Sequence, residues 1–365
     1  MYRTIEFHDE DKYIDDFLLL PKLLYDKRTF TQNEQEERKI LEEKHVLNKY
    51  FTQYKFLTYD EADRVCARCI VSVYRSPDEA YIGYFECADD SGCAEALFAR
   101  AHECAARCGF SRITGPVDSG FWIKYRLKTD SFDRKPYVGE PYNKPYYKRL
   151  FEENGYTVKE SWVSNIYKKL PLFYNKKTIY YDRLKNAEER NYKIVHPKPA
   201  DFDSIIEIIY YLLSETFRDF VVFREISKED FKEIFKDYRY ILDYNFVSIA
   251  YIQGAPAAFS IVLPDYQNLL YGKLTLYKKI RILLKKIRSS NYISLYMGVE
   301  KQHRGLGKAL SQKIIENVYI RRAGCIGALI TEGKITEKYA EEQIGEKSRY
   351  VLYEKEISGS DSYIY

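Results

Sequence analysis

A glycine-rich turn between an apolar strand and a helix constrains this chain more than any other feature. Residues 292–299 form an apolar, strand-like run, and residues 308–323 have a helical pattern; between them stands Glu-Lys-Gln-His-Arg-Gly-Leu-Gly. Gly305 and Gly307 permit positive φ and a close approach of the backbone to a ligand. The helix start adds unpaired N–H groups and partial positive charge, so the turn predicts a diphosphate-binding loop. It lacks the Gly-Lys-Ser/Thr ending of a P-loop and the third glycine of the dinucleotide fingerprint.

The order of the elements around this turn favours one fold over an ordinary strand-to-helix turn. The sequence predicts helices at residues 201–217, 227–241 and 335–344, and strands at 246–252, 255–263, 325–331 and 350–357. With this order, the spacing Gln302-x-x-Gly305-x-Gly307 resembles the acyl-CoA pyrophosphate loop of the GCN5-related N-acetyltransferase (GNAT) superfamily.

The first half of the chain repeats part of this pattern. Strand-like runs at residues 55–59, 66–74, 80–87 and 111–115 accompany helical runs at 93–108 and 145–154. The segment Leu150-Phe151-Glu152-Glu153-Asn154-Gly155-Tyr156 is similar to the end of a GNAT domain.

The whole chain resembles a bacterial tandem-GNAT protein. The resemblance implies an α/β (α+β) fold of two GNAT-like lobes, each with a mixed, mostly antiparallel central sheet flanked by helices. We expect residues 1–185 to form a degenerate lobe with an N-terminal helical extension. Residues 186–365 are expected to form the N-acetyltransferase domain with the intact acyl-CoA loop.

The first lobe departs from the family pattern at two places. Glu86, Asp89 and Asp90 stand where the phosphate loop would lie, and three carboxylates there would repel a diphosphate. Phe151 stands where GNAT enzymes commonly carry a proton-donating tyrosine. We therefore expect this lobe neither to bind acyl-CoA nor to carry out chemistry.

For the second lobe, the resemblance implies a site for acetyl-CoA or another acyl-CoA. Met297 and Val299 would pair through their backbones with the pantetheine. The residues expected at the pyrophosphate are Gln302, Arg304, Gly305, Leu306, Gly307, Lys308 and Ala309. Arg304 and Lys308 would add charge to the site, or they are solvated surface residues.

The expected reaction is direct attack of a neutral amine on the thioester, which requires loss of an ammonium proton and a proton for the leaving thiolate. Tyr339 matches the family's tyrosine acid; the alternative is an aromatic packed on the core. Glu332 is the nearest candidate base, with Glu215 and Asp265 as others. Each is otherwise an ordinary surface acid, and water would then take the proton.

An aromatic, polar loop in the first lobe contains Tyr142, Asn143 and Tyr146. Because ligands often bind between domains, we expect these residues to line an acceptor pocket between the lobes. The alternative is a packed structural loop.

Residues 266–290 form an insertion with several basic side chains and no acidic one. The basic residues are Lys273, Lys278, Lys279, Arg281, Lys285, Lys286 and Arg288. Its apolar residues recur at helical spacing. Three interpretations remain open: a helix packed over the acceptor cleft with a solvated basic face, a lid or contact for an anionic acceptor or the CoA phosphates, and attachment to a membrane surface.

Composition narrows the class of protein. The chain has 365 residues, of which 45% are hydrophobic and 31% charged, and no apolar run long enough to cross a bilayer. Its acidic start does not resemble a targeting peptide. We expect a cytoplasmic protein without integral membrane association. Cys66-x-x-Cys69, with Cys87 and Cys93, suggests zinc, but the spacing differs from that of a zinc ribbon, so no metal is expected.

Together these patterns predict an acyl-CoA-dependent acyltransferase, an N-acetyltransferase acting on a small-molecule amine, with neither DNA nor tRNA as partner. One alternative is a Fem-like transferase that uses aminoacyl-tRNA. Another is a non-catalytic acyl-CoA-binding or scaffold protein. No motif identifies the acceptor, the acyl chain length or the oligomeric state.

Overall fold

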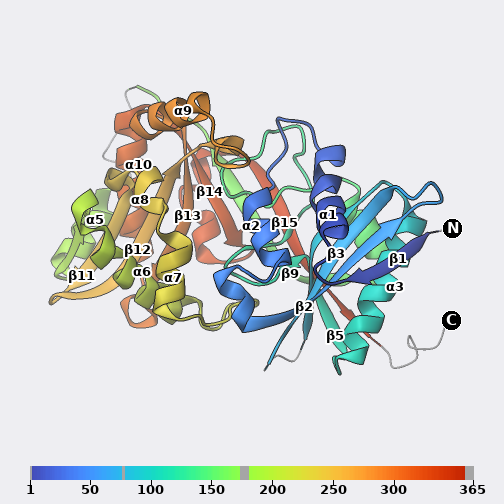
Figure 1. Cartoon of the computed structure of the whole chain (residues 1–365). Helices are drawn as coiled ribbons and strands as arrows, with labels where there is room; N and C mark the ends of the chain where they lie inside the picture. Colours follow the sequence, from blue (N-terminus) through green and yellow to red (C-terminus); the bar gives the residue numbers. More distant parts are fainter. Residues whose placement is uncertain (1, 76–78, 173–180, 358–365) are drawn as a thin grey trace. The chain divides into compact units, whose positions relative to one another are not determined.

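The computed structural model describes residues 2–75, 79–172 and 181–357, and they fall into two compact units (Figure 1). Unit 1 comprises Met1–Pro136, Pro141–Ser161 and Arg349–Tyr365, and unit 2 comprises Tyr137–Glu140 and Trp162–Ser348. The chain is therefore not divided at the single point expected, residue 185. Residues 162–167, from the first half of the sequence, pair with a strand of unit 2. Residues 350–356, from the end of the chain, pair with strands of unit 1.

Unit 1 contains a mixed sheet in the strand order β1-β2-β3-β4-β5-β15. The strands are β1 (Arg3–Phe7), β2 (Phe51–Tyr59), β3 (Val65–Tyr74), β4 (Ala80–Cys87), β5 (Arg112–Gly115) and β15 (Ile344–Glu356, of which residues 349–356 belong to this unit). The short β6 (Val117–Asp118), β7 (Lys124–Tyr125) and β8 (Leu127–Lys128) lie beside them. Only β4 and β5 are parallel among these neighbouring pairs. The helices are α1 (Asp11–Leu24), α2 (Glu34–Leu41), α3 (Ser91–Arg107) and α4 (Tyr147–Glu153).

The core of unit 1 lies between α3 and the sheet. Leu97, Ala101 and Cys104 recur at helical spacing on α3 and are fully or almost fully buried. Phe151, the residue at the expected tyrosine position, is buried there with Phe85 and Phe98, each ring centroid 5.0 Å from it. Phe151 is therefore part of the packed core.

Unit 2 contains a second mixed sheet in the order β9-β14-β13-β12-β11-β10. Its strands are β9 (Thr157–Tyr167, of which residues 162–167 belong to this unit), β10 (Tyr192–Val195), β11 (Val247–Ile252), β12 (Ala255–Pro264), β13 (Asn291–Val299) and β14 (Gly324–Thr331). Its helices are α5 (Tyr181–Glu189), α6 (Phe202–Phe217), α7 (Lys228–Phe235), α8 (Tyr238–Ile241), α9 (Leu276–Ile287) and α10 (Leu306–Arg321). The pair β13–β14 is parallel, and the other neighbouring pairs are antiparallel. Both lobes thus have the predicted mixed, mostly antiparallel sheet flanked by helices.

The prediction of a helix at residues 335–344 is wrong. The segment forms two short 3₁₀ turns, Ile335–Lys338 and Glu341–Gln343, because Ala340 has a left-handed backbone with φ +54°. Its carbonyl groups are bound by β9 instead of by a helix: Asn165 Nδ2 donates to Glu337 O at 2.8 Å, and Tyr167 Oη donates to Tyr339 O at 3.1 Å. Tertiary contacts override helix propensity here.

Two further elements differ from the expected pattern. The N-terminal extension is not only helical, because β1 adds an antiparallel edge strand to β2. The helix expected at residues 227–241 divides into α7 and α8. The strand, glycine turn and helix around Gly305 are confirmed as β13, the loop and α10.

Candidate active site

One edge of β13 is open over its second half. β13 pairs with β12 up to Val299, but with β14 only over Asn291–Ser294. Beyond Gly327 the strand β14 follows β9, where Ile330 pairs with Val163. Within the described part of the chain, residues 295–299 therefore have no strand partner on the β14 side. Met297 and Val299 lie in this stretch, both half-buried.

The glycine turn that follows presents amide groups at a helix start. Gly305 has φ +103°, a conformation that other residues rarely adopt, and it directly precedes α10. Lys308 N donates to Gly305 O at 3.1 Å. Apart from hydrogen bonds internal to a helix, the N–H groups of residues 304–307 have no backbone carbonyl partner among the described residues. A run of unpaired amides at a helix N-terminus is suited to an anion.

The side chains of the loop divide into two groups. Leu306 and Ala309 are each 1% exposed and pack with Ala258, so only their backbones can reach a ligand. Arg304 and Lys308 are exposed and can contribute charge. The structure therefore fits a loop that binds through its backbone and carries a basic rim.

A carboxylate that sequence reasoning missed anchors this loop. Glu300 accepts a hydrogen bond from Tyr211 Oη at 2.9 Å and from Gln302 Nε2 at 3.0 Å. Its other neighbour is His303, whose Nε2 lies 3.4 Å from Oε2. Tyr192 Oη lies 3.0 Å from the Nδ1 of the same histidine. The sequence pattern that could have indicated this role is an acidic residue directly after the strand, Glu300, followed three residues later by His303.

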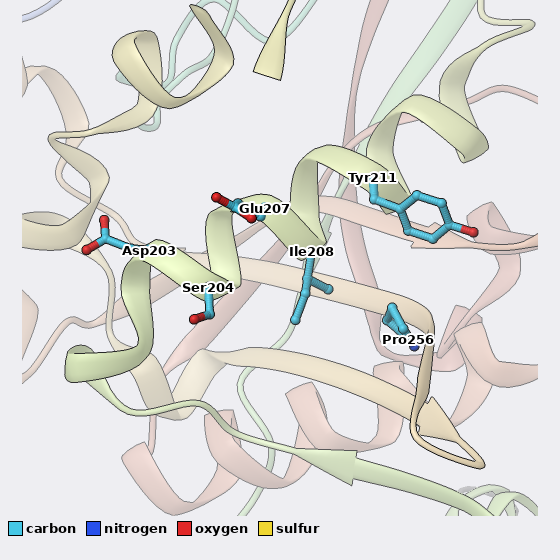
Figure 2. A pocket seen from close by; sticks show the side chains of 6 residues that line it. All are labelled: Asp203, Ser204, Glu207, Ile208, Tyr211 and Pro256. Atoms are coloured by element: carbon cyan, nitrogen blue, oxygen red, sulfur yellow. The ribbon is translucent and has the colours of Figure 1, made fainter. Parts of the chain in front are cut away.

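Tyr211 also lines a hollow of about 470 Å³ along α6 (Figure 2). The acids in this hollow are already paired, because Arg239 lies 2.9 Å from Asp203 and Lys232 lies 3.0 Å from Glu207. Tyr211 thus connects the hollow to the loop through its hydrogen bond to Glu300.

Tyr339 lies beside the first turn of α10. A Cβ built on Gly307 would lie 3.1 Å from Tyr339 Oη and 3.7 Å from Met297 Sδ. Partial burial raises the pKa of Tyr339, and the nearby Arg183 guanidinium opposes that rise. The hydroxyl thus stays protonated at neutral pH. The open strand, the loop and the tyrosine predicted from sequence are brought together.

None of the three candidate bases is joined to Tyr339 by a hydrogen bond or ion pair in the described part of the chain. Glu332 is exposed in the turn after β14. Glu215 forms an ion pair with Arg218 at 2.7 Å. Asp265 is buried, which raises its pKa, and it accepts hydrogen bonds from Gln267 N of the adjoining turn at 2.9 Å and from Val138 N at 3.1 Å.

The residues proposed for the acceptor belong to unit 1. Asn143 is buried, and its side chain makes three hydrogen bonds to backbone groups of Lys128 and Lys144, between 2.7 and 3.1 Å long. Tyr142 Oη donates to Phe132 O at 3.3 Å, and Tyr146 Oη donates to Cys87 O at 2.8 Å. Asn143 fits the alternative of a packed structural loop, because its amide is fully engaged.

Unit 1 fills the corresponding helix start with its own carboxylate. Asp90 precedes α3 and accepts a hydrogen bond from Cys93 N at 2.8 Å, which occupies the place of an anionic ligand. Asp89 is turned to Arg149, 2.6 Å away. Glu86 was expected in the loop but lies on β4, buried, where it accepts a hydrogen bond from Tyr147 Oη at 2.6 Å.

The strand β4 is also open, since it pairs with β5 only at Ala80 and Tyr81, but side chains close the opening. Asp118 Oδ1 accepts from Tyr84 N at 2.5 Å, and Tyr147 Oη accepts from Cys87 N at 2.9 Å. Backbone groups of β4 that could pair with a pantetheine are thus satisfied internally. This supports the expectation that the first lobe is degenerate.

Over the described ranges, no group of three or more His, Cys, Asp or Glu side chains could hold a metal ion. No described helix combines the length and apolar character needed to cross a membrane.

No protein-family model matches the chain. Protein YghO of Escherichia coli (strain K12) is 23% identical over 296 residues, which are 77% of this chain and 75% of that protein. A tandem GNAT protein from the clavulanic acid biosynthesis pathway superposes with a TM-score of 0.52 at 12% identity, covering 98% of this chain and 99% of its own. The chain has the tandem GNAT fold.

A GCN5-related N-acetyltransferase from Sphaerobacter thermophilus also matches over nearly the whole chain. It superposes with a TM-score of 0.50 at 15% identity, covering 98% of this chain and 96% of its own. The glucosamine N-acetyltransferase region of a fungal multi-domain β-N-acetylglucosaminidase reaches a TM-score of 0.54 at 10% identity, covering 97% of this chain and 38% of the other. At identities of 10–15%, the similarity to these three structures shows the fold alone.

Proposed function

We propose that unit 2 binds acetyl-CoA, or another acyl-CoA, and transfers the acyl group to the amine of a small molecule. One juxtaposition carries this proposal: the open edge of β13, the unpaired amides of residues 304–307 and the Tyr339 hydroxyl converge on the first turn of α10. The pantetheine would pair with the backbone of Met297 and Val299, and the pyrophosphate would accept from the loop amides.

In the proposed reaction the neutral amine attacks the thioester carbonyl. The C–N bond forms, the C–S bond breaks, and the electron pair leaves with the sulfur. Tyr339 is protonated at neutral pH, since its pKa is raised by burial, and it would donate its proton or a hydrogen bond to the leaving thiolate. The proton lost by the amine would go to water or to a carboxylate such as Glu332.

In this proposal unit 1 contributes no acyl-CoA site of its own, which agrees with the filled helix start at Asp90 and the occupied strand β4. We further propose that the protein acts in the cytoplasm and that its acceptor is a small molecule, not DNA or tRNA.

The test is release of CoA thiol from acetyl-CoA across a panel of small amines, with wild-type protein and with Tyr339→Phe. We expect at least one amine to support release by the wild type and a much lower rate in the variant. Tight binding of acetyl-CoA without thiol release for any amine would instead favour the non-catalytic, acyl-CoA-binding alternative.

A further inference from the structure

Helix α9 turns its apolar face away from the protein. Six of its apolar side chains are between 52% and 75% exposed: Leu276, Tyr277, Ile280, Leu283, Leu284 and Ile287. The partly buried side chains of the helix are instead Lys278, Ile282, Lys285 and Lys286. Of the three interpretations left open by the sequence, a helix packed over a cleft by its apolar stripe is wrong, because the stripe faces outward.

Lysines hold the helix in this orientation. Lys278 Nζ donates to Tyr271 O at 2.6 Å, and Lys285 Nζ donates to Asp265 O at 2.5 Å, seven residues further along the same face. Lys286 Nζ donates to the carbonyl of Tyr240 at 2.8 Å. Three charge-assisted hydrogen bonds thus bind the lysine face of α9 to unit 2 and leave the apolar stripe outside.

An outward apolar stripe on a surface helix is unusual, because such a helix normally buries it against the core. A large exposed apolar patch marks a place where something else binds. Ile280, Leu284 and Ile287 lie at spacings of four and three residues, so they form one continuous strip along the helix.

The charges beside the stripe identify what binds there. At 100° per residue, Arg281 and Arg288 lie along one edge of the stripe and Lys279 along the other, and Lys273 precedes the helix. Residues 266–290 contain no acidic side chain. A second copy of this surface would bring like charges together, whereas a surface of anionic headgroups complements them.

We infer that α9 is an in-plane anchor that docks unit 2 on an anionic lipid surface. The apolar stripe enters the boundary between headgroups and acyl chains, to a depth of about 5–10 Å. The flanking Lys279, Arg281 and Arg288 extend along their aliphatic stems and place their charges among the headgroups. The anchor acts independently of the proposed acyl transfer, and the docking is reversible and salt-sensitive.

The test is co-sedimentation of the full chain with vesicles of phosphatidylcholine alone, or of equal parts phosphatidylcholine and phosphatidylglycerol. We expect binding to the anionic vesicles that weakens as salt is added. Ile280→Asp with Leu284→Asp should lower the partition coefficient at least tenfold. Ile320→Asp is the control, since Ile320 is an isoleucine on α10 that is 73% exposed, more than Ile280 at 52%, and it should bind like the wild type.

A second variant tests the charges separately. Because each basic residue near an anionic surface contributes about 1 kcal/mol, Lys279→Gln, Arg281→Gln and Arg288→Gln together should reduce binding about 100-fold. Circular dichroism and thermal melting establish that each variant is folded. Folded wild type that fails to sediment with anionic vesicles overturns the inference. So does an aspartate variant that converts a dimer to a monomer in light scattering, since the stripe would then cover a second copy.

Discussion

Gly305 is the position where the loop geometry can be tested most sharply. Its φ of +103° lies in the region that favours glycine, and a Cβ there would meet only the Arg190 guanidinium, at 3.3 Å, which is the far end of a flexible side chain. Gly305→Ala therefore adds backbone strain without a steric clash in the core. The strain of a left-handed backbone for alanine is about 1–2 kcal/mol.

Gly254 offers a matched control. It has φ +85° in the turn between β11 and β12, with nothing within 4 Å of a built Cβ. Gly254→Ala should cost a similar 1–2 kcal/mol in the free energy of unfolding. Both variants are measured by urea denaturation, and their affinity for acetyl-CoA by calorimetry.

The expected difference between the two variants lies in binding. Gly305→Ala either retains the loop with its strain or relaxes it and redirects the amides of residues 304–307. A relaxed loop that loses two amide hydrogen bonds to a charged group, each contributing about 1.5–3 kcal/mol, would weaken binding more than 100-fold. Gly254→Ala should bind like the wild type. A Gly305→Ala variant that shows no loss of unfolding free energy, and has therefore relaxed its loop, yet binds acetyl-CoA with unchanged affinity would refute the assignment of the loop.

The remaining predictions concern three side chains. Tyr339→Phe should lower kcat about 100-fold or more in the thiol-release assay with little change in acetyl-CoA affinity. On the alkaline side, wild-type activity should fall as pH rises through the elevated pKa of this tyrosine. Asp90→Ala should cost about 1 kcal/mol of unfolding free energy at pH 7. Hydrogen bonds from backbone amides lower the pKa of Asp90, so its contribution is present at neutral pH and should be lost as pH falls below about 4; denaturation at several pH values checks this. Tyr147→Phe leaves Cys87 N and the buried Glu86 without this partner and should cost about 2–3 kcal/mol, with acetyl-CoA affinity unchanged in calorimetry.

Local patterns in the sequence predicted most of the elements and the donor loop. The run from β13 through Gly305 into α10 is encoded by neighbouring residues, so its position was predicted to within two residues. The expected role of Tyr339 depended on a resemblance. Its place beside Gly307 arises from β9 binding the carbonyls of residues 337 and 339, which no local pattern reveals.

The errors share a physical cause, namely long-range contacts. The exchange of strand ends between the units follows from the pairing of β15 with β5 and of β9 with β14. Glu300 was overlooked because its partners Tyr192 and Tyr211 act from other elements, one through His303 and one directly. The amphipathic period of α9 was correctly read, but the side that faces the protein is set by lysine contacts to distant carbonyls.

The central claim is that the loop of unit 2 is the acyl-CoA site. Its most direct test is calorimetric titration of the full chain with acetyl-CoA, beside a Gly305→Glu, Gly307→Glu variant whose folding is checked by circular dichroism. We predict one site per chain with micromolar affinity in the wild type and no detectable binding in the folded variant, because two carboxylates would occupy the amides that hold the diphosphate. Absence of wild-type binding to acetyl-CoA and to longer acyl-CoAs, or equal binding by both proteins, would contradict the account.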